Sequence, residues 1–447
     1  MQQPQAQPAN GVNLTEQTAD FVAAHRTEDV RELALKSKRV DGLDLPLALD
    51  QIAGWQIACK KLPQWASCEG IIYPPHISME QCSSQFTAQY KSEIAQTLLT
   101  PAVTVRARMS DSAESDTQET KTGVRVTDSP ESDTLVARSS MVDLTGGFGV
   151  DFSYLARGFS QATYVERQRH LCDLAEHNMA ALGLDQARIV CGDGVEYLRQ
   201  MDPVDFIYLD PARRDEHGSR TYAIEDCTPN VLELRDLLLA KSQCTLVKLS
   251  PMLDWRKAVA DFDGTVREVH IVATGNECKE LLLVLGQQVH EEPSAPRVFC
   301  VNDNQRIDYD SAAYTQGLRI GGKPLPEAKN YLYEPNASIM KAGCFDLVEE
   351  RFGVTQVGPS SHLFVSATPV ADFPGRGFAI EAIGGMNKKD IKRLLNGTKQ
   401  ANIAVRNFPL TAPQLRKKLK LADGGPVYLF GTTMQGCDHV LLRTSKI

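Results

Sequence analysis

Acidic residues and glycines recur at the ends of short hydrophobic runs in the middle of the chain. The first run, Met141–Leu144, leads directly into Thr145-Gly146-Gly147-Phe148-Gly149. Glycines let the backbone approach a ligand closely and adopt positive φ, and a helix after the turn would offer free N–H groups at its start. Taken alone, this turn is compatible with a dinucleotide site, a phosphate site or a plain strand-to-helix connection.

Carboxylates follow the second and third hydrophobic runs. Glu166 lies 23 residues after Asp143, and an acidic side chain at such a distance typically binds the hydroxyl pair of a ribose. Asp193, in Cys191-Gly192-Asp193-Gly194, is placed to accept a hydrogen bond from an adenine amino group. It is nearly as well placed to cap the helix expected from Val195.

The fourth run, Val204–Leu209, ends in Asp210-Pro211-Ala212-Arg213. Ligands of open α/β sheets bind at the carboxyl ends of the strands, so we expect Asp210 opposite the glycine turn. Arg213 and Arg214 follow at once. They either grip a phosphate of the substrate or are solvated charges on an exposed loop.

In this order, the glycine turn, the acid after strand two, the Gly-Asp after strand three and the Asp-Pro after strand four resemble the class I S-adenosylmethionine-dependent methyltransferases. The resemblance covers residues 135–286. It implies S-adenosyl-L-methionine as the cofactor and no metal. It assigns the methionine part to Asp143, Gly146, Gly147 and Gly149, the ribose to Glu166 and the adenine to Asp193. Phe148 is included among the cofactor-binding residues. Asp210 and Pro211 would face the target as the catalytic residues.

The residues after Asp210-Pro211 bear on the target atom. Relatives that methylate amino groups carry Asn/Asp-Pro-Pro-aromatic, whereas Ala212 and Arg213 stand in the last two positions here. Asp-Pro-Ala-Arg also resembles the Asp-Pro-Pro-Arg of uridine C5-methyltransferases, which need a cysteine nucleophile after strand five. This chain has Lys248-Leu249-Ser250-Pro251 there, and a serine without an adjacent base is a weak nucleophile. We therefore expect a ring or exocyclic nitrogen as the acceptor.

A basic segment near the C-terminus stands out in a chain whose net charge is −8. Residues 384–420 contain ten basic residues and a single acidic one, Asp390, for a local net charge of +9. Such a footprint is typical of a protein that binds a phosphate backbone, although lysines also lie simply on solvated helix faces. The surrounding pattern resembles the THUMP-like domain of some bacterial methyltransferases, a module associated with RNA. The candidate RNA-binding residues are Arg213, Arg214, Lys388, Lys389, Arg393, Arg406, Lys417 and Lys418.

The elements that must position these residues follow from hydrophobic patterning. Alternating strand and helix patterns predict a Rossmann-like, seven-stranded α/β methyltransferase domain over residues 135–290. Its last two strands, Val266–Ala273 and Glu280–Gly286, are expected as an antiparallel pair that closes the sheet. The runs 297–301 and 305–309 are expected in the next module instead.

The rest of the chain divides into four further segments. Residues 1–108 are expected as an N-terminal helical region and 109–134 as an acidic flexible loop, because few hydrophobic residues occur there. Residues 291–375 resemble the ferredoxin-like module of the same family, marked by Tyr333–Ala337 and Phe373–Arg376. Residues 376–447 form the expected α+β THUMP-like domain.

Composition restricts the class of protein. The chain has 447 residues, 42% of them hydrophobic, which suffices for several domains. No apolar run reaches the roughly 18–20 residues that a membrane span needs, and the first residues lack the features of a signal peptide. Eleven cysteines without a C-x-x-C pair predict reduced thiols and a cytoplasmic protein.

The sequence thus predicts an S-adenosylmethionine-dependent methyltransferase that modifies a base in rRNA or tRNA. One alternative is a non-catalytic RNA-binding protein that keeps a vestigial methyltransferase fold. Another is a methyltransferase for a protein or a small molecule. A nicotinamide enzyme is more distant, because the glycine turn lacks the G-x-G-x-x-G spacing.

Overall fold

The computed structural model describes residues 14–37, 41–99, 139–213, 224–286, 295–314, 330–436 and 438–447. Within these ranges the chain forms two compact units. The first unit comprises the described residues up to Val266 and residues 283–286, and the second comprises Arg267–Leu282 and the described residues from 295 onward. The expected acidic loop at 109–134 and Arg214 lie outside the described residues.

The N-terminal region is helical, as expected. Its helices are α1 (Glu16–His25), α2 (Val30–Lys36), α3 (Leu45–Lys61), α4 (Pro63–Ala66), α5 (His76–Gln81) and α6 (Gln85–Leu99). Side-chain oxygens at Thr15, Asp29 and Asp44 accept hydrogen bonds from the first free N–H groups of α1, α2 and α3. Between α5 and α6 the helical conformation is interrupted at residues 82–84.

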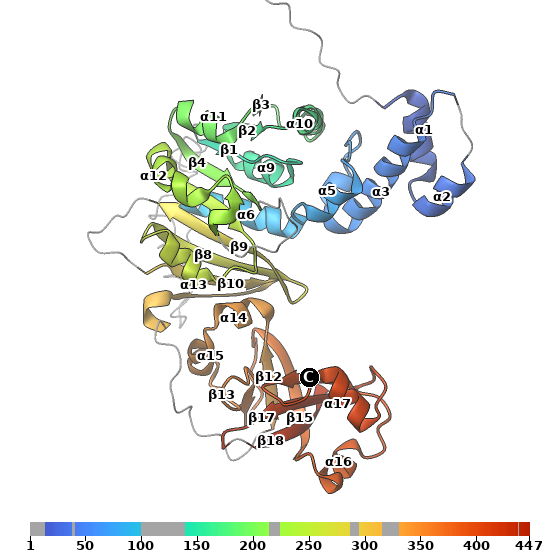
Figure 1. Ribbon diagram of the computed structural model, residues 1–447, viewed down its shortest axis with the longest axis vertical. Helices are drawn as coiled ribbons and strands as arrows, with labels where there is room; N and C mark the ends of the chain where they lie inside the picture. Colours follow the sequence, from blue (N-terminus) through green and yellow to red (C-terminus); the bar gives the residue numbers. More distant parts are fainter. Residues whose placement is uncertain are drawn as a thin grey trace, which may run out of the picture. The chain divides into compact units, whose positions relative to one another are not determined.

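A nine-stranded sheet spans the middle of the chain (Figure 1). Its order is β11-β10-β8-β9-β7-β4-β1-β2-β3. The strands are β1 (Ser140–Asp143), β2 (Gln161–Glu166), β3 (Ala187–Cys191), β4 (Val204–Leu209), β7 (Ser242–Leu249), β8 (Val266–Thr274), β9 (Glu277–Gly286), β10 (Arg297–Asn302) and β11 (Gln305–Asp310). From β1 the chain proceeds to β2 and β3 on one side and to β4 and β7 on the other, so the strand order switches direction between β1 and β4.

The connections between these strands are mostly helical. They contain α9 (Val150–Leu155), η1 (Ala156–Gly158), α10 (Arg169–Ala181), α11 (Gly194–Gln200), η2 (Ile224–Asp226), α12 (Val231–Lys241) and α13 (Trp255–Asp261). A separate two-stranded ribbon joins β5 (Ala212–Arg213) to β6 (Cys227–Thr228). The expected Rossmann-like architecture is confirmed, because β1, β2, β3, β4 and β7 pair in parallel.

The far side of this sheet differs from the expectation. β8 and β9 form a hairpin through Gly275 and Asn276, both with positive φ, as a two-residue turn requires. The hairpin does not close the sheet, because β10 pairs in parallel with β8 and β11 pairs with β10. The runs at 297–301 and 305–309, which we expected in the ferredoxin-like module, therefore extend the first sheet. A strand's residue pattern encodes which of its faces are buried, but not which strand pairs along its edge.

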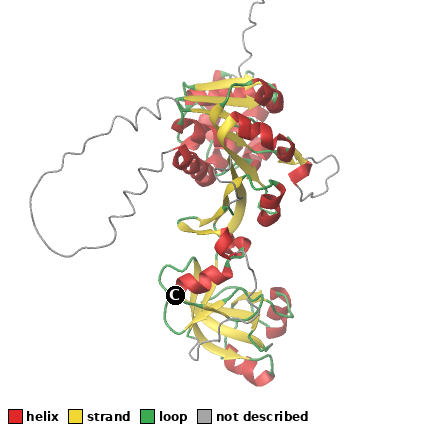
Figure 2. Ribbon diagram, turned by 90° about the vertical axis from the view of Figure 1, so that its left-hand side faces the viewer, coloured by secondary structure: helices red, strands yellow, loops and turns green. Residues whose placement is uncertain are grey.

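The second unit contains a seven-stranded sheet in the order β13-β14-β12-β15-β18-β17-β16 (Figure 2). The strands are β12 (Tyr331–Pro335), β13 (Thr355–Gln356), β14 (Phe364–Ser366), β15 (Gly375–Gly384), β16 (Asn402–Arg406), β17 (Val427–Thr433) and β18 (His439–Lys446). Its helices are η3 (Ser311–Tyr314), α14 (Ala337–Ala342), α15 (Phe345–Phe352), α16 (Lys388–Leu395) and α17 (Ala412–Leu419). β12 pairs with β15, so the two expected C-terminal modules share one sheet.

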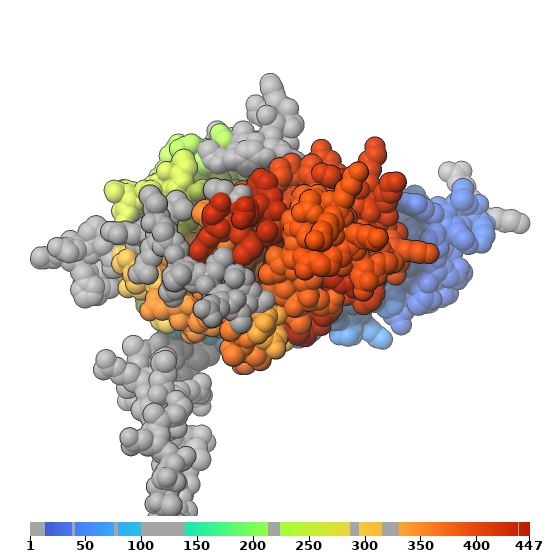
Figure 3. All heavy atoms as spheres, turned by 90° about the horizontal axis from the view of Figure 1, so that it is seen from below, coloured from blue at the N-terminus to red at the C-terminus, as the bar shows by residue number. Residues whose placement is uncertain are grey.

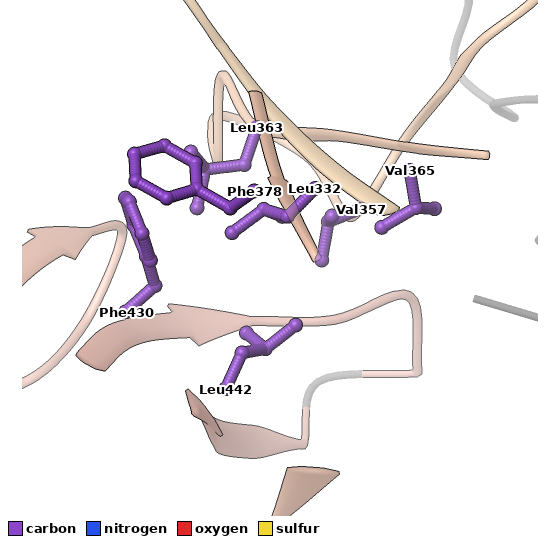
Figure 4. Close-up of a cluster of buried hydrophobic side chains, with 7 residues drawn as sticks. All are labelled: Leu332, Val357, Leu363, Val365, Phe378, Phe430 and Leu442. Atoms are coloured by element: carbon purple, nitrogen blue, oxygen red, sulfur yellow. The ribbon is translucent and has the colours of Figure 1, made fainter. Parts of the chain in front are cut away.

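Both faces of the second sheet are packed. Neighbouring residues of β17 and β18 point to opposite faces, as the period of a strand requires. Phe430 and Leu442 join one cluster with Leu332 and Phe378 (Figure 4). Their neighbours Leu429 and Leu441 join a second cluster with residues of α16 and α17. The basic helices are therefore anchored by buried leucines, and their outer faces are left for solvent or a partner.

Candidate active site

The predicted cofactor-binding and catalytic residues lie at one edge of the first sheet, formed by the carboxyl ends of its parallel strands. Asp143 ends β1, Glu166 ends β2, and Asp210 follows the last residue of β4. In the parallel register, Asp143 is paired with Tyr164 on one side and Tyr208 on the other. This edge lies where the strand order switches, which is the usual ligand position in such sheets.

Gly146 fits the glycine turn against β2. Its N–H donates to the carbonyl of Val165 at 2.9 Å, and a Cβ at this position would come within 3.0 Å of three ring atoms of Tyr164. The Tyr164 hydroxyl donates to the carbonyl of Gly147. Burial raises the pKa of Tyr164 above its ordinary value, so the phenol stays a donor. Gly147 and Gly149 have positive φ, and Gly149 is the N-cap of α9.

Other glycines leave room beside Glu166. The N–H of Gly147 donates to Oε2 of Glu166 at 3.0 Å, and the N–H of Gly192 donates to its backbone carbonyl at 2.9 Å. A Cβ at Gly192 would meet nothing within 4 Å, and one at Gly147 would meet only the Thr145 carbonyl at 3.7 Å. The backbone on both sides of Glu166 is thus open to a ligand.

Glu166 itself is suited to a pair of hydroxyl groups. The side chain is buried, Oε2 accepts from Gly147, and Oε1 accepts from the N–H of Gln168 at 2.9 Å. Each carboxylate oxygen can accept a second hydrogen bond. The carboxylate is therefore fixed in orientation. No other described residue donates to it, so each oxygen keeps one acceptor position, which fits the ribose of the implied cofactor.

Two further predicted cofactor residues have clear structural tasks. Oδ1 of Asp143 accepts from the N–H of Thr145 at 2.9 Å, and burial raises the pKa of Asp143 well above its ordinary value. Asp143 therefore shapes the turn from inside. Oδ1 of Asp193 caps α11 by accepting from Val195 and Glu196. No described residue donates to its Oδ2, so capping and contact with an adenine are compatible.

Phe148 belongs to a contact with the N-terminal helices. Its ring is buried, 5.0 Å from the ring of Trp65, and the Trp65 indole N–H donates to Ser153 Oγ at 3.2 Å. The side-chain amide of buried Asn178 accepts from the Ile72 N–H and donates to the Ile72 carbonyl, both at 2.9 Å. These contacts join the N-terminal region to α9 and α10.

Asp210 is held at two points. Its N–H donates to the Thr145 hydroxyl at 2.6 Å, and its Oδ2 accepts from the ammonium of Lys248, also at 2.6 Å. The Asp210 side chain is 39% exposed, and Pro211 is buried. Asp210 can therefore meet a ligand from solvent while its orientation is fixed. No described residue donates to its Oδ1.

Lys248 connects Asp210 to a set of charged groups that sequence reasoning missed. Lys248 lies at the end of β7 near Asp151 of α9, and Asp151 also pairs with Lys91 of α6. Two signals in the sequence point to them. Lys248 stands at a strand end, and Lys91 is a charged residue at helical spacing from Ala88 and Ala95, both of which are buried. A lysine on a buried helix face requires a partner.

The end of β7, the fifth strand of the predicted methyltransferase domain, also bears on methylation at C5 of uridine. Uridine C5-methyltransferases have a cysteine nucleophile at this position, whereas this chain has Lys248-Leu249-Ser250-Pro251. In the N-terminal region, Cys82 precedes Ser83, whose hydroxyl accepts a hydrogen bond from Lys248 at 3.3 Å, but burial raises the pKa of the Cys82 thiol above its ordinary value. A thiol with a raised pKa is a poor nucleophile. These side chains are consistent with the prediction that the methyl group is transferred to a nitrogen atom.

The six predicted RNA-binding residues of the C-terminal segment fall into two groups. Lys388, Lys389, Lys417 and Lys418 are exposed on α16 and α17, in the C-terminal part drawn in orange and red in Figure 3. In contrast, Arg393 donates to the Ile383 carbonyl at 2.7 Å. Arg406 pairs at 2.8 Å with buried Glu334, which also binds Arg376. Both arginines therefore have structural partners. Arg213 is described only as part of the β5 backbone.

Two features are absent from the described residues. None of their helices combines the length and apolar character that crossing a membrane requires. They also contain no group of three or more His, Cys, Asp or Glu side chains arranged to hold a metal ion.

Comparison with known proteins gives the following matches. Residues 331–374 match the family description of a ferredoxin-like domain, and residues 375–446 match that of a THUMP domain-like module. The structure of a predicted methyltransferase from Porphyromonas gingivalis W83 is 30% identical, with 96% of this chain and 97% of that chain covered and a TM-score of 0.76. No curated protein matches the chain.

More distant structures cover a smaller part. A SAM-dependent methyltransferase from Agrobacterium tumefaciens is 16% identical over 34% of this chain and 56% of its own, with a TM-score of 0.26. An rRNA methylase from Streptococcus thermophilus is 14% identical over 34% of this chain and 89% of its own, also with a TM-score of 0.26. The family is therefore given by the Porphyromonas structure.

Proposed function

The chain belongs to the class I S-adenosylmethionine-dependent methyltransferase family that carries a C-terminal THUMP-like domain, and we propose that it methylates a base nitrogen in rRNA or tRNA. The main support is that the glycine turn, Glu166, Asp193 and Asp210 all lie at the carboxyl ends of neighbouring parallel strands, on both sides of the switch point of the first sheet. These are the groups that the family resemblance assigns to the cofactor and to the target.

The residues present fit the cofactor. Glu166 keeps two acceptor positions for a ribose, Asp193 keeps Oδ2 for an adenine amino group, and the backbone at Gly147 and Gly192 is open. When bound there, S-adenosyl-L-methionine supplies an activated methyl group. Asp210 would accept a hydrogen bond from the target nitrogen and orient its lone pair. Alignment of the reacting groups in this way is a large source of rate enhancement.

The acceptor is proposed to be RNA because of the second unit. Four lysines, Lys388, Lys389, Lys417 and Lys418, are exposed on two helices that buried leucines anchor. Lysines that neutralise phosphates release counterions, so binding through them weakens as salt rises. The match to a THUMP domain-like module agrees with this assignment.

Calorimetry with S-adenosyl-L-methionine tests the cofactor assignment. Wild-type protein should bind, and Glu166→Gln should weaken binding by about 10- to 100-fold, because a hydrogen bond to a charged group contributes about 1.5–3 kcal/mol. Glu196→Gln is the matched control, since Glu196 is a 58% exposed carboxylate on nearby α11. No binding by wild-type protein at millimolar ligand would support the vestigial RNA-binding alternative instead.

A methyl-transfer assay tests the acceptor. An extract of cells that lack the gene is incubated with the enzyme and radiolabelled cofactor, its RNA, protein and small-molecule fractions are separated, and mass spectrometry locates the modified nucleotide in any labelled RNA. Asp210→Ala should abolish transfer and leave cofactor affinity nearly unchanged, whereas Asp236→Ala, at an exposed position of α12, should behave as wild type. Label in protein or small-molecule fractions but not in RNA would contradict the proposed substrate class.

The salt dependence of RNA binding tests the surface on α17. Replacing Lys417 and Lys418 with glutamate should weaken binding and reduce the slope of log affinity against log salt by about two, one for each phosphate that a lysine no longer neutralises. Lys36→Glu on α2, an exposed lysine of the N-terminal region, is the control. An unchanged slope in the double variant would place the RNA elsewhere.

A further inference from the structure

Lys248 lies between two carboxylates. Its ammonium nitrogen is 2.6 Å from Oδ2 of Asp210 and 3.7 Å from Oδ2 of Asp151, and it also donates to Ser83 Oγ at 3.3 Å. The nearer carboxylate is the one that the proposed function places at the target. The geometry of the site therefore depends on Lys248 binding Asp210 and not the more buried Asp151.

Asp151 is compensated from another direction. Lys91 of α6 is fully buried, and its ammonium lies 3.2 Å from Oδ1 of Asp151. Oδ2 of Asp151 accepts from the hydroxyls of Tyr208 at 2.7 Å and Ser83 at 2.8 Å. Burial by itself would raise the pKa of Asp151, but Lys91, Lys248 and these hydroxyls outweigh it and lower the pKa. Asp151 is thus a buried anion.

The N-terminal region supplies half of this arrangement. α6 packs against α9, which brings Lys91 to Asp151. The break between α5 and α6 places Ser83 where its hydroxyl donates to Asp151 and accepts from Lys91 at 3.2 Å and from Lys248. With Asp210, two lysines and two aspartates form a set whose formal charges cancel.

We propose that Lys91 is a positioning residue of the active site, contributed by the N-terminal helical region. Because Lys91 neutralises Asp151, Lys248 can form its short hydrogen bond with Asp210. This inference rests on the role of Asp210 in the proposed function.

Electrostatics gives the reason. Without Lys91, Asp151 would be a buried carboxylate with Lys248 as its remaining close cation among these residues. Attraction between opposite charges strengthens at short distance and in a weakly screening interior, and a buried ion without a partner is strongly disfavoured. Lys248 would move toward Asp151, and the Asp210 carboxylate would no longer have the hydrogen bond that fixes its orientation.

A rescue experiment on the full chain tests this role. Lys91→Met should lower kcat for methyl transfer by at least about tenfold, the factor that follows from about 1.4 kcal/mol of poorer alignment, with KM and Kd for S-adenosyl-L-methionine unchanged. Lys91→Met/Asp151→Asn should recover kcat to within about threefold of wild type, because the competing anion is gone while the amide still accepts from Tyr208 and Ser83. Lys60→Met, at an exposed position of α3, is the control.

The double variant decides the matter even if Lys91→Met does not fold, because it removes both buried charges together. A double variant with intact cofactor affinity but a kcat more than about threefold below wild type would overturn the proposal, since the pair itself would then be needed. A single variant with wild-type kcat would do the same.

A crystal structure of a folded variant gives a readout that does not depend on activity. In Lys91→Met, the Lys248 ammonium should lie closer to Asp151 than to Asp210. In the double variant, it should return to Asp210. If wild-type protein transfers no methyl group, the proposed function fails. These two distances then still show whether Lys91 controls the partner of Lys248, and an unchanged position in Lys91→Met would contradict it.

Discussion

Gly146→Ala is expected to destabilise the first unit by about 3 kcal/mol. The added carbon would come within 3.0 Å of three ring atoms of Tyr164, a side chain that is fully buried and cannot swing into solvent. Overpacking of this kind costs about 1–3 kcal/mol. A shift of the ring would also break the hydrogen bond from its hydroxyl to the Gly147 carbonyl, which adds about 1–3 kcal/mol. The gain from a less flexible unfolded chain offsets about 0.4–1 kcal/mol.

Thermal unfolding by calorimetry measures this effect. For a unit of this size, about 3 kcal/mol lowers Tm by roughly 6–12 °C. Gly192→Ala is the matched control, because its Cβ would meet nothing within 4 Å and its φ is not positive. It should leave Tm nearly unchanged, although it lies at the same edge of the sheet.

A double-mutant cycle shows whether the ring causes the loss of stability. Tyr164→Val removes the ring atoms that the new methyl group would meet, so Gly146→Ala should cost at least about 1 kcal/mol less in that background than in wild type. If the two changes simply add, or if Gly146→Ala leaves Tm within about 1 °C of wild type, the steric reasoning is wrong and Gly146 is needed for another reason.

Three further outcomes are expected. Asn178→Leu should cost about 2–4 kcal/mol, because both backbone groups of Ile72 would be left without a buried partner; hydrogen exchange at the Ile72 amide should accelerate, and unchanged exchange would contradict the contact. The pKa of Asp151 is lowered from 3.8, so its contribution to stability is complete above that pH and is lost as pH falls through the lower folded value. Urea unfolding of Lys91→Met/Asp151→Asn should therefore depend less on pH in this acid range than wild type. Glu334→Gln should lower the stability of the second unit by about 1–3 kcal/mol, since Arg376 and Arg406 would no longer have a charged acceptor. An unchanged Tm would show that these two ion pairs contribute little.

The candidate site could be predicted from the sequence to the extent that it consists of strand ends. Asp143, Glu166 and Asp210 each follow a recognisable hydrophobic run, and parallel strands bring their carboxyl ends to a common edge. The glycine turn was predictable for the same reason. The sequence did not show the steric reason for Gly146, because the ring of Tyr164 that requires a glycine there lies on another strand.

Side chains that approach the site from outside the strand–helix units escaped prediction. Lys91 lies far upstream of Asp151, and the sequence around either residue does not show that the two form an ion pair. Lys91 lies at helical spacing from two alanines, but a helix pattern does not identify the partner that a buried charge needs. Similarly, Arg406 looked like part of the basic surface, whereas Glu334 holds it at 2.8 Å.

The sequence by itself determined the Rossmann-like domain, the order of its acidic strand ends and the basic character of the C-terminal helices, because these are properties of local pattern and composition. Only the tertiary structure decided that β10 and β11 extend the first sheet, that the two C-terminal modules share a sheet, and that Lys91 compensates Asp151. Strand edges and buried charges find their partners through the fold as a whole. Unpaired edges present free hydrogen-bonding groups, and unpaired buried charges are strongly disfavoured, but neither requirement specifies in the sequence which residue will satisfy it.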